Sequence, residues 1–134
     1  MEQAYGAVTR LLNDYFDGLY HSDSKLLAQV FDPRAQYVCA VPGASVGDKA
    51  AQDGLLHLGM DDYLPIVAER PSPASRGEPR RDRILSIEFA GPETAFARVE
   101  CAIGRRAFTD FLSLVRVAGQ WRIIAKVFHY DDSA

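Results

Sequence analysis

The sequence predicts an α+β fold, in which helices come first along the chain and pack on a mostly antiparallel sheet. Two observations carry this prediction. Apolar residues of the first half recur at helical spacing, whereas the second half has long β-branched and aromatic runs that short turns separate. The length of 134 residues is enough for a hydrophobic core, so we expect residues 1–134 to form a single domain.

Three helices are expected. Residues 8–19 have one apolar face with spacings of three and four residues, formed by Val8, Leu11, Leu12, Tyr15, Phe16 and Leu19. The segment HSDS supplies N-cap residues for a second helix, KLLAQVF, which the pair Asp32–Pro33 ends. The segment MDDYLPIVAERP predicts a third helix, capped near Asp61, with Pro65 close enough to the first turn to be tolerated.

Strand patterns fill most of the remaining chain. The segments AQYVCAV and LLHLG indicate two short strands, and RPSPASRGEPRR is typical of an exposed loop. Four long strands follow, at residues 83–90, 94–104, 107–117 and 121–130. The segment GPE, the pair Arg105–Arg106 and the pair Ala118–Gly119 mark the turns between them.

Alternation along these strands predicts two different faces. With two-residue turns, Asp110 lies opposite Val127 and Cys101, and Phe108 lies opposite His129. One face is then apolar except for Asp110 and His129; its apolar members are Ala95, Ala97, Val99, Cys101, Ile103, Phe108, Leu112, Leu114, Trp121, Ile123, Ala125 and Val127. The other face mixes aromatic and charged residues and is predicted to be a homodimer surface through Phe111, Ile124 and Phe128.

Asp110 is the residue that most needs an explanation, because a carboxylate on an apolar face must find a partner. In the register above it shares the concave side with His129. A bulge at the turn Ala118–Gly119 would shift the last strand by one residue and offer Lys126 as the partner instead.

The segments VFDPRAQYV, VAERPSP and FTDFLSLVRVAGQWRIIAKVFH, together with the first helix, resemble the nuclear transport factor 2-like superfamily, specifically its SnoaL-like or "putative lumazine-binding" branch. The resemblance covers residues 8–129 and is most specific in the C-terminal hairpin. It implies a cone-shaped α+β barrel of three helices and a strongly curved sheet around a pocket, usually dimeric through the sheet. The superfamily includes ketosteroid isomerases, polyketide cyclases, dehydratases and non-catalytic binding or transport proteins, so the fold alone does not give the function.

Our leading hypothesis is a pocket for a small, mainly apolar or ring-containing ligand. If the protein is an enzyme, the predicted chemistry is cofactor-free proton transfer, as in an isomerase, cyclase or dehydratase. Asp110 would be the general base, with Tyr15 and His129 as hydrogen-bonding partners. The alternative is a non-catalytic binding or interaction protein in which Asp110 is structural.

Eight further residues are candidates for the wall of the pocket, each with core packing or a solvated strand end as the alternative. They are Tyr37, Cys39, His57, Val99, Cys101, Phe108, Leu112 and Trp121. The arginines at positions 70, 76, 80, 81 and 83 are expected in a solvated loop, with attraction of an anionic ligand as the alternative.

Composition narrows the classes of partner. The net charge of −3 argues against nucleic-acid binding, and no run of apolar residues is long enough for a membrane span. Cys39 and Cys101 have no metal-type spacing and are expected to be reduced thiols. The sequence contains no phosphate-binding glycine loop and no HExxH motif, so we expect no cofactor and no metal. The segment MEQAYGAVTRLLNDYF has acidic residues and no continuous apolar stretch, so we expect no signal peptide, and the reduced cysteines predict a cytoplasmic protein.

Overall fold

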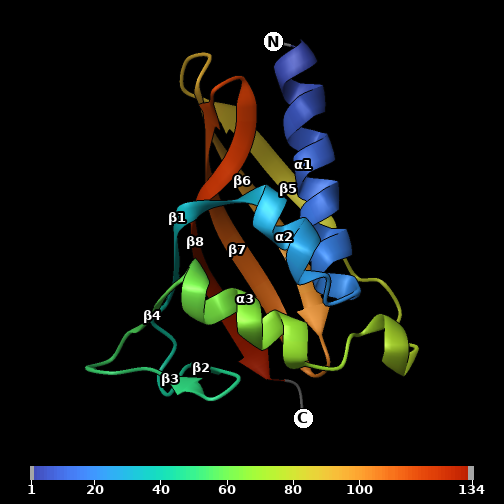
Figure 1. Cartoon of the computed structure of the whole chain (residues 1–134), viewed down its shortest axis with the longest axis vertical. Helices are drawn as coiled ribbons and strands as arrows, with labels where there is room; N and C mark the ends of the chain where they lie inside the picture. Colours follow the sequence, from blue (N-terminus) through green and yellow to red (C-terminus); the bar gives the residue numbers. More distant parts are fainter. Residues whose placement is uncertain (1, 133–134) are drawn as a thin grey trace.

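The computed structural model describes residues 2–132, in which three helices cover one face of a six-stranded sheet (Figure 1). The helices are α1 (Glu2–Tyr20), α2 (Ser24–Val30) and α3 (Met60–Glu69). The sheet has the order β4-β1-β8-β7-β6-β5, with β1 (Phe31–Cys39), β4 (Leu56–Gly59), β5 (Arg83–Phe89), β6 (Thr94–Ile103), β7 (Arg106–Val117) and β8 (Gln120–Asp132). Only β1 and β8 pair in parallel in this sheet, so the predicted mostly antiparallel α+β fold is confirmed.

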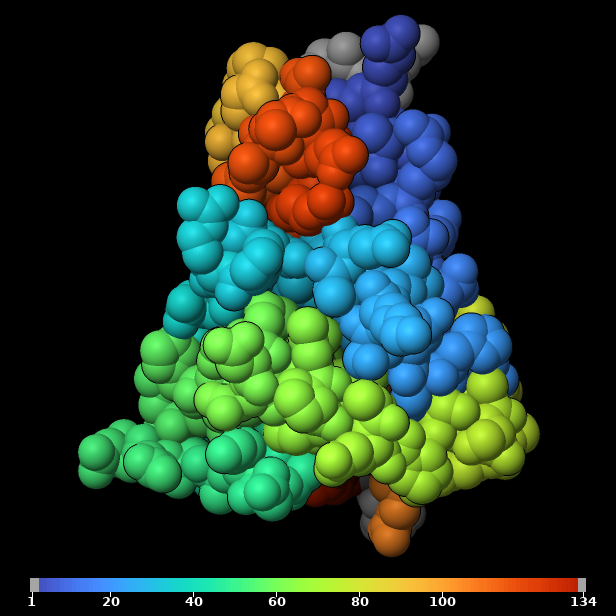
Figure 2. All heavy atoms as spheres, viewed as in Figure 1, coloured from blue at the N-terminus to red at the C-terminus, as the bar shows by residue number. Residues whose placement is uncertain are grey.

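The molecule has the shape of a cone. Figure 2 shows an outline that widens from the β7–β8 turn toward α3. A small hairpin of β2 (Ser45–Val46) and β3 (Lys49–Ala50) lies at the wide end, and a 3₁₀ turn, η1 (Ala74–Arg76), follows α3. Within residues 2–132, no helix is long and apolar enough to cross a membrane.

The first two helices follow the predicted pattern. The apolar stripe of α1 is buried against the sheet at Val8, Leu12, Tyr15, Phe16 and Leu19. The side chain of Asp23 accepts a hydrogen bond from the backbone N–H of Leu26 and thereby caps α2, as the segment HSDS predicted.

The expected cap of α3 is wrong. The N-cap is Gly59, which has no side chain to accept a hydrogen bond, and α3 begins at Met60. Pro65 is therefore in the helix interior, where it has no N–H for the carbonyl of Asp61. The helix is held instead by its buried stripe of Met60, Tyr63 and Val67.

The turn between β6 and β7 is also one residue earlier than predicted. Ile103 pairs with Arg106, so the turn consists of Gly104 and Arg105, and Gly104 has a positive φ of 59°. Cys101 consequently lies opposite Phe108 rather than Asp110. Because this changes the register by two residues, every side chain keeps its predicted face.

A bulge in β8 reverses one of the predicted faces. Val117 pairs with Gln120 and Leu114 with Ile123, as expected for the two-residue turn. Ser113 then pairs with Ala125, which leaves Ile124 as an extra residue on β8. A single extra residue exchanges the two faces beyond it, so the reversal arises within the strand and not at the turn.

The residues of β8 beyond the bulge lie on the faces opposite to those predicted. Lys126, Phe128 and Tyr130 are buried on the concave side, whereas Val127 and His129 are exposed. Phe128 is 6% exposed and its ring centroid lies 4.8 Å from that of Tyr37, so its assignment to a dimer surface is wrong.

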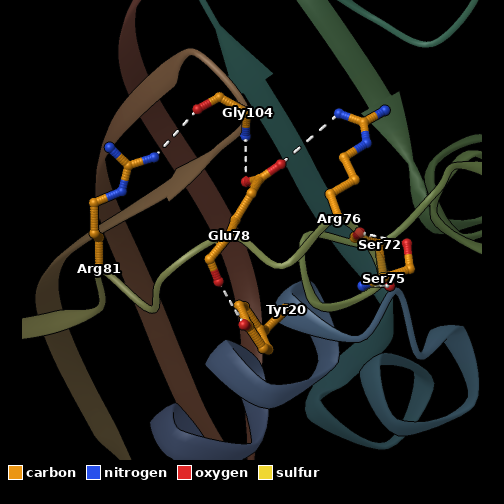
Figure 3. A network of polar contacts seen from close by, with 7 residues as sticks. All are labelled: Tyr20, Ser72, Ser75, Arg76, Glu78, Arg81 and Gly104. Carbon is orange, nitrogen blue, oxygen red and sulfur yellow. Dashed lines mark hydrogen bonds and ion pairs between the residues drawn. The ribbon is translucent and has the colours of Figure 1, made fainter.

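The loop of residues 70–82 runs from α3 to β5 around the wide end and is fastened through Glu78 (Figure 3). The backbone carbonyl of Glu78 accepts a hydrogen bond of 2.5 Å from the Tyr20 hydroxyl. Its carboxylate accepts a bond of 2.9 Å from the backbone N–H of Gly104. These contacts tie the loop to the end of α1 and to the β6–β7 turn, so the segment that follows Arg70 has a defined path.

Candidate functional site

Asp110 lies on β7 in the interior and is fully buried. Its Oδ2 atom accepts a hydrogen bond of 2.6 Å from the Tyr15 hydroxyl, so the expected contact between these residues is present. The ammonium of Lys126 lies 3.9 Å from the same oxygen and the Cys101 thiol lies 4.0 Å from it. The other carboxylate oxygen, Oδ1, is buried without a hydrogen-bond partner. Asp110 is therefore paired through one oxygen only.

Lys126 is the partner that the bulge brings to Asp110. Its side chain is 3% exposed, and its ammonium is surrounded by aromatic rings from α1, α3, β1, β7 and β8. The ring centroids lie 4.9–5.9 Å from Nζ and belong to Phe128, Tyr37, Tyr15, Phe108 and Tyr63. Ring faces attract a cation, so these rings and Asp110 replace the water that the ammonium loses on burial.

The pKa values of the groups around Asp110 are shifted by burial and by the negative charge of Asp110. Burial raises the pKa of Tyr15 well above 10.0, and the charge of Asp110 raises it further. Burial also raises the pKa of the Cys101 thiol, with Asp110 acting in the same direction. For Lys126, burial has the largest effect and lowers the pKa, but Asp110, Tyr63 and Cys101 together outweigh burial and the pKa is raised. Tyr15 and Cys101 are thus protonated and Lys126 charged at neutral pH.

A cavity of about 150 Å³ adjoins Lys126 at the wide end of the cone, and we call it the Lys126 cavity. Its aromatic wall consists of Tyr37, Tyr63 and Phe108. Tyr37 and Tyr63 are stacked, with centroids 4.4 Å apart and an angle of 26° between the rings. Val46, Gly47 and Ile103 complete the apolar lining. Of the predicted pocket residues, Tyr37 and Phe108 line this cavity.

Three basic side chains also line the Lys126 cavity, namely Arg70, Arg106 and Lys126. Arg106 lies 3.2 Å from Asp132 and donates to the backbone carbonyl of Ser45. Arg70 is the C-cap residue of α3, and two of its guanidinium nitrogens, Nε and Nη2, are buried without a hydrogen-bond partner. The cavity is therefore aromatic and basic rather than simply apolar.

The predicted proximity of His129 to Asp110 is wrong. The imidazole is on the exposed face of β8, where its side chain is 60% exposed and its Nε2 atom lies 3.1 Å from Asp131. The cause is the bulge at Ile124, which turns Lys126 inward and His129 outward. A catalytic role for Asp110 and Tyr15 stays a prediction.

The other predicted pocket residues lie outside the Lys126 cavity. Cys39, Val99 and Leu112 are fully buried in the core, and Cys101 is buried beside Asp110. His57 is exposed on β4, where its ring contacts Gln36. Trp121 packs against Phe89 and borders a different hollow of about 350 Å³, near the start of α1. That hollow contains none of the buried ionisable groups described above.

Sequence reasoning did not assign Lys126, Arg70 or Tyr63 to the pocket. Tyr63 had a detectable signal, because Met60, Tyr63 and Val67 follow helical spacing. Lys126 depended on a shift of register that the sequence left open. Arg70 belongs to an arginine-rich segment that favoured solvent exposure, and only the end of α3 fixes its place on the cavity.

Metal binding has no support in the described part of the chain. Among residues 2–132, no three His, Cys, Asp or Glu side chains gather closely enough to hold a metal ion. The side chains that line the Lys126 cavity offer ammonium, guanidinium and phenol groups.

Comparison with solved structures identifies close relatives of the fold. An NTF-2 like protein of unknown function from Silicibacter pomeroyi is 23% identical, with a TM-score of 0.76 and coverage of 97% of this chain and 98% of the other. A protein of the same description from Shewanella baltica is 25% identical, with a TM-score of 0.77 and coverage of 98% and 96%. A cystatin-like fold protein from Burkholderia xenovorans is 12% identical, with a TM-score of 0.68 and coverage of 98% and 95%.

Comparison with curated proteins gives no significant match. The sequence model of one family, described as "Putative lumazine-binding", matches residues 3–129. This match spans nearly the whole chain and agrees with the NTF2-like descriptions of the two solved structures that share its fold. The chain therefore belongs to the "Putative lumazine-binding" family of the NTF2-like superfamily.

Proposed function

We propose that this protein binds a small ring-containing molecule in the Lys126 cavity. The observation that carries the proposal is the aromatic wall of Tyr37, Tyr63 and Phe108 around a basic end. Ligand sites in proteins are typically concave, lined by apolar and aromatic side chains, and oriented by a few polar groups. The family description names lumazine, which like the proposed ligand is a planar ring compound, although its two fused rings are larger than the single ring that suits this cavity.

The size of the cavity limits the ligand. Sites for drug-sized ligands have volumes of roughly 300–1,000 Å³, whereas the Lys126 cavity has about 150 Å³. A ligand of one ring with one or two small substituents fits this size. The stacked pair of Tyr37 and Tyr63 offers a preformed flat surface, so little conformational entropy is lost on binding.

Asp110 acts on this site indirectly, through its ion pair with Lys126. It does not line the cavity, and its Oδ2 atom is already engaged by Tyr15 and Lys126. We therefore assign Asp110 the role of a positioning residue that holds the Lys126 ammonium at the base of the cavity. Removal of Asp110 is expected to lower the affinity for the ligand, because the Lys126 ammonium would no longer be held at the cavity.

Proton transfer by Asp110 is the second candidate function, as in a cofactor-free isomerase, cyclase or dehydratase. One observation favours it, because Oδ1 is buried without a hydrogen-bond partner and is free to accept a proton. The position of Asp110 outside the lining of the Lys126 cavity weighs against it, since a general base must come within hydrogen-bond reach of the substrate.

The two cysteines support a cytoplasmic location. Cys39 and Cys101 are both free thiols in the interior. Free thiols are kept in reducing compartments, whereas oxidising compartments favour disulfides. Microscopy of a fluorescent fusion tests the location, and fluorescence outside the cytoplasm would contradict it.

A titration followed by heteronuclear NMR tests the binding proposal. Small ring compounds at millimolar concentration are added to the wild-type protein and to two tryptophan variants. Ile103→Trp fills the Lys126 cavity from the end of β6. Ile84→Trp is the matched control, because Ile84 is also half-buried and pairs with Val99 away from the cavity.

The proposal expects ring compounds to shift the backbone resonances of Gly47 and Ile103 in the wild type. The same shifts are expected at Gly47 in Ile84→Trp and are expected to be lost in Ile103→Trp. Absence of binding to the wild type, or equal binding to Ile103→Trp, would contradict the proposal. Turnover of a ring ketone that Asp110→Asn abolishes, in a variant that still binds the compound, would favour proton transfer instead.

A further inference from the structure

The charges around the Lys126 cavity are not balanced. Lys126 has a carboxylate partner in Asp110, at 3.9 Å. Arg106 has one in Asp132, at 3.2 Å. For Arg70, no carboxylate lies within ion-pair distance among residues 2–132. The cavity therefore has one positive charge more than its protein neighbours neutralise.

The guanidinium of Arg70 is also short of hydrogen-bond acceptors. Its Nε and Nη2 atoms are both buried and neither donates to the described part of the protein. Buried donors without a partner destabilise a fold, and charged donors do so most. A ligand with acceptor oxygens would satisfy these nitrogens and would supply the missing negative charge.

We infer that the ligand of the Lys126 cavity is a monoanion with a carboxylate group, which Arg70 and Lys126 bind together. This inference rests on the proposed function and names the chemical class of its ligand. The planar fork of a guanidinium matches the two oxygens of a carboxylate, whereas an ammonium acts as a point charge. One unpaired positive charge fits a monoanion better than a phosphate dianion.

The ring and the carboxylate have separate places in the cavity. The aromatic wall of Tyr37, Tyr63 and Phe108 suits a planar ring, and the basic end suits the charged group. An aromatic acid of the size of benzoate has both parts within a cavity of about 150 Å³. Benzamide is its neutral counterpart, with nearly the same shape and without the charge.

The test compares benzoate with benzamide by NMR titration of the wild type, Arg70→Met and Arg10→Met. Arg70→Met keeps much of the side-chain volume and removes the charge. Arg10→Met makes the same change of net charge at an exposed position on α1. Ile103→Trp is included so that binding in the Lys126 cavity is distinguished from binding elsewhere.

The wild type and Arg10→Met are expected to bind benzoate roughly tenfold or more tightly than benzamide, as follows from the value of a charged hydrogen bond. Arg70→Met is expected to reduce the affinity for benzoate by roughly tenfold to a hundredfold and to leave the affinity for benzamide unchanged. Ile103→Trp is expected to bind neither compound.

Equal affinity of the wild type for benzoate and benzamide would overturn the inference and leave the ring-binding proposal intact. The same holds if Arg70→Met keeps the preference for benzoate. Failure of the wild type to bind either compound at millimolar concentration would contradict the inference and the proposed function together.

Discussion

The buried pair of Asp110 and Lys126 is the residue-scale feature that most distinguishes this molecule. Burying two charges costs more free energy than their mutual attraction returns unless further groups stabilise them. Here Tyr15 stabilises the carboxylate and five aromatic rings stabilise the ammonium. Such a pair adds little to the stability of the fold, and its main effect is to hold its charged groups in place. Here it holds the Lys126 ammonium at the cavity.

Removal of either partner is expected to destabilise the fold strongly. Asp110→Leu or Lys126→Met leaves one buried charge without its counterion, which costs about 3–5 kcal/mol. The double variant removes both charges and is expected to recover most of this loss. Urea unfolding of the two single variants and the double variant gives the coupling free energy.

An exposed ion pair provides the control for this cycle. Lys49 and Asp62 lie 3.9 Å apart with side chains 44% and 53% exposed. Lys49→Met is expected to change the unfolding free energy by less than about 1 kcal/mol, because surface pairs are weak. A cost for Lys126→Met that is no larger than that for Lys49→Met would contradict the account.

Alkaline pH is expected to unfold the protein through four buried groups. Burial raises the pKa of Tyr15 and of Tyr37 above 10.0 and that of the Cys101 thiol above 9.0. For Lys126, Asp110, Tyr63 and Cys101 together raise the pKa above 10.5 against the effect of burial. A folded-state pKa above the unfolded value gives stability that is present below the unfolded value and is lost as pH rises past it. Stability should therefore begin to fall above about pH 9, where the Cys101 thiol of the unfolded chain ionises, and should fall further above about pH 10.

The measurement is an alkaline titration followed by tyrosinate absorbance and by circular dichroism. Tyr15 and Tyr37 are expected to ionise in the same step in which the secondary structure is lost. Tyr15→Phe should reduce the absorbance change of that step. Ionisation of all tyrosines before any loss of structure would contradict the buried positions of these two rings.

At the scale of elements, the contact between α1 and α2 depends on a glycine. A Cβ built on Gly18 would lie 2.5 Å from the Cδ2 atom of Leu27, which is fully buried. Gly18→Ala is therefore expected to destabilise the protein by about 1–3 kcal/mol through overpacking. Thermal or urea unfolding measures this change.

Gly6 is the matched control on the same helix. A Cβ there would meet only the side chain of Arg10, at 3.5 Å. Gly6→Ala is expected to stabilise the protein by about 1 kcal/mol, because glycine is a poor helix former. Stabilisation by both substitutions would show that α1 and α2 do not pack as closely as described.

Several regular elements could be predicted because they have a complete local signal. The stripe of α1, the cap of α2 and the two-residue turn at Ala118–Gly119 are all visible in the sequence and present in the structure. The β7–β8 turn has positive φ angles at both residues, 50° and 79°, as a tight hairpin requires.

The bulge in β8 could not be predicted, because Ile123, Ile124 and Ala125 are three consecutive apolar residues. Alternation is readable on either side of such a run but does not show which residue is the extra one. This ambiguity affected the candidate site only beyond the bulge. Tyr15, Asp110, Tyr37 and Phe108 lie on the interior side, as the sequence indicated. His129 was predicted to face the interior and Lys126 the outside, and the structure has the reverse.

At the scale of the whole molecule, the outer face of the sheet is expected to form a homodimer. Phe111 and Val127 pair across β7 and β8 and are 43% and 48% exposed. Neighbouring exposed apolar residues on a sheet are typical of an interface. This surface keeps Phe111 from the sequence prediction and replaces the buried Phe128 with Val127.

Light scattering tests the dimer. The wild type and Tyr5→Glu, a control at an exposed aromatic residue on α1, are expected to be dimeric. Val127→Glu is expected to be a folded monomer. A monomeric wild type, or a Val127→Glu protein that remains dimeric, would contradict this assembly.

A crystal structure of the protein with benzoate tests whether the Lys126 cavity binds an aromatic carboxylate. We expect the ring against Tyr37, Tyr63 and Phe108. We expect the carboxylate on the guanidinium of Arg70 and the ammonium of Lys126. Benzoate in the hollow beside Trp121, or in the Lys126 cavity with its carboxylate directed away from Arg70, would contradict this expectation.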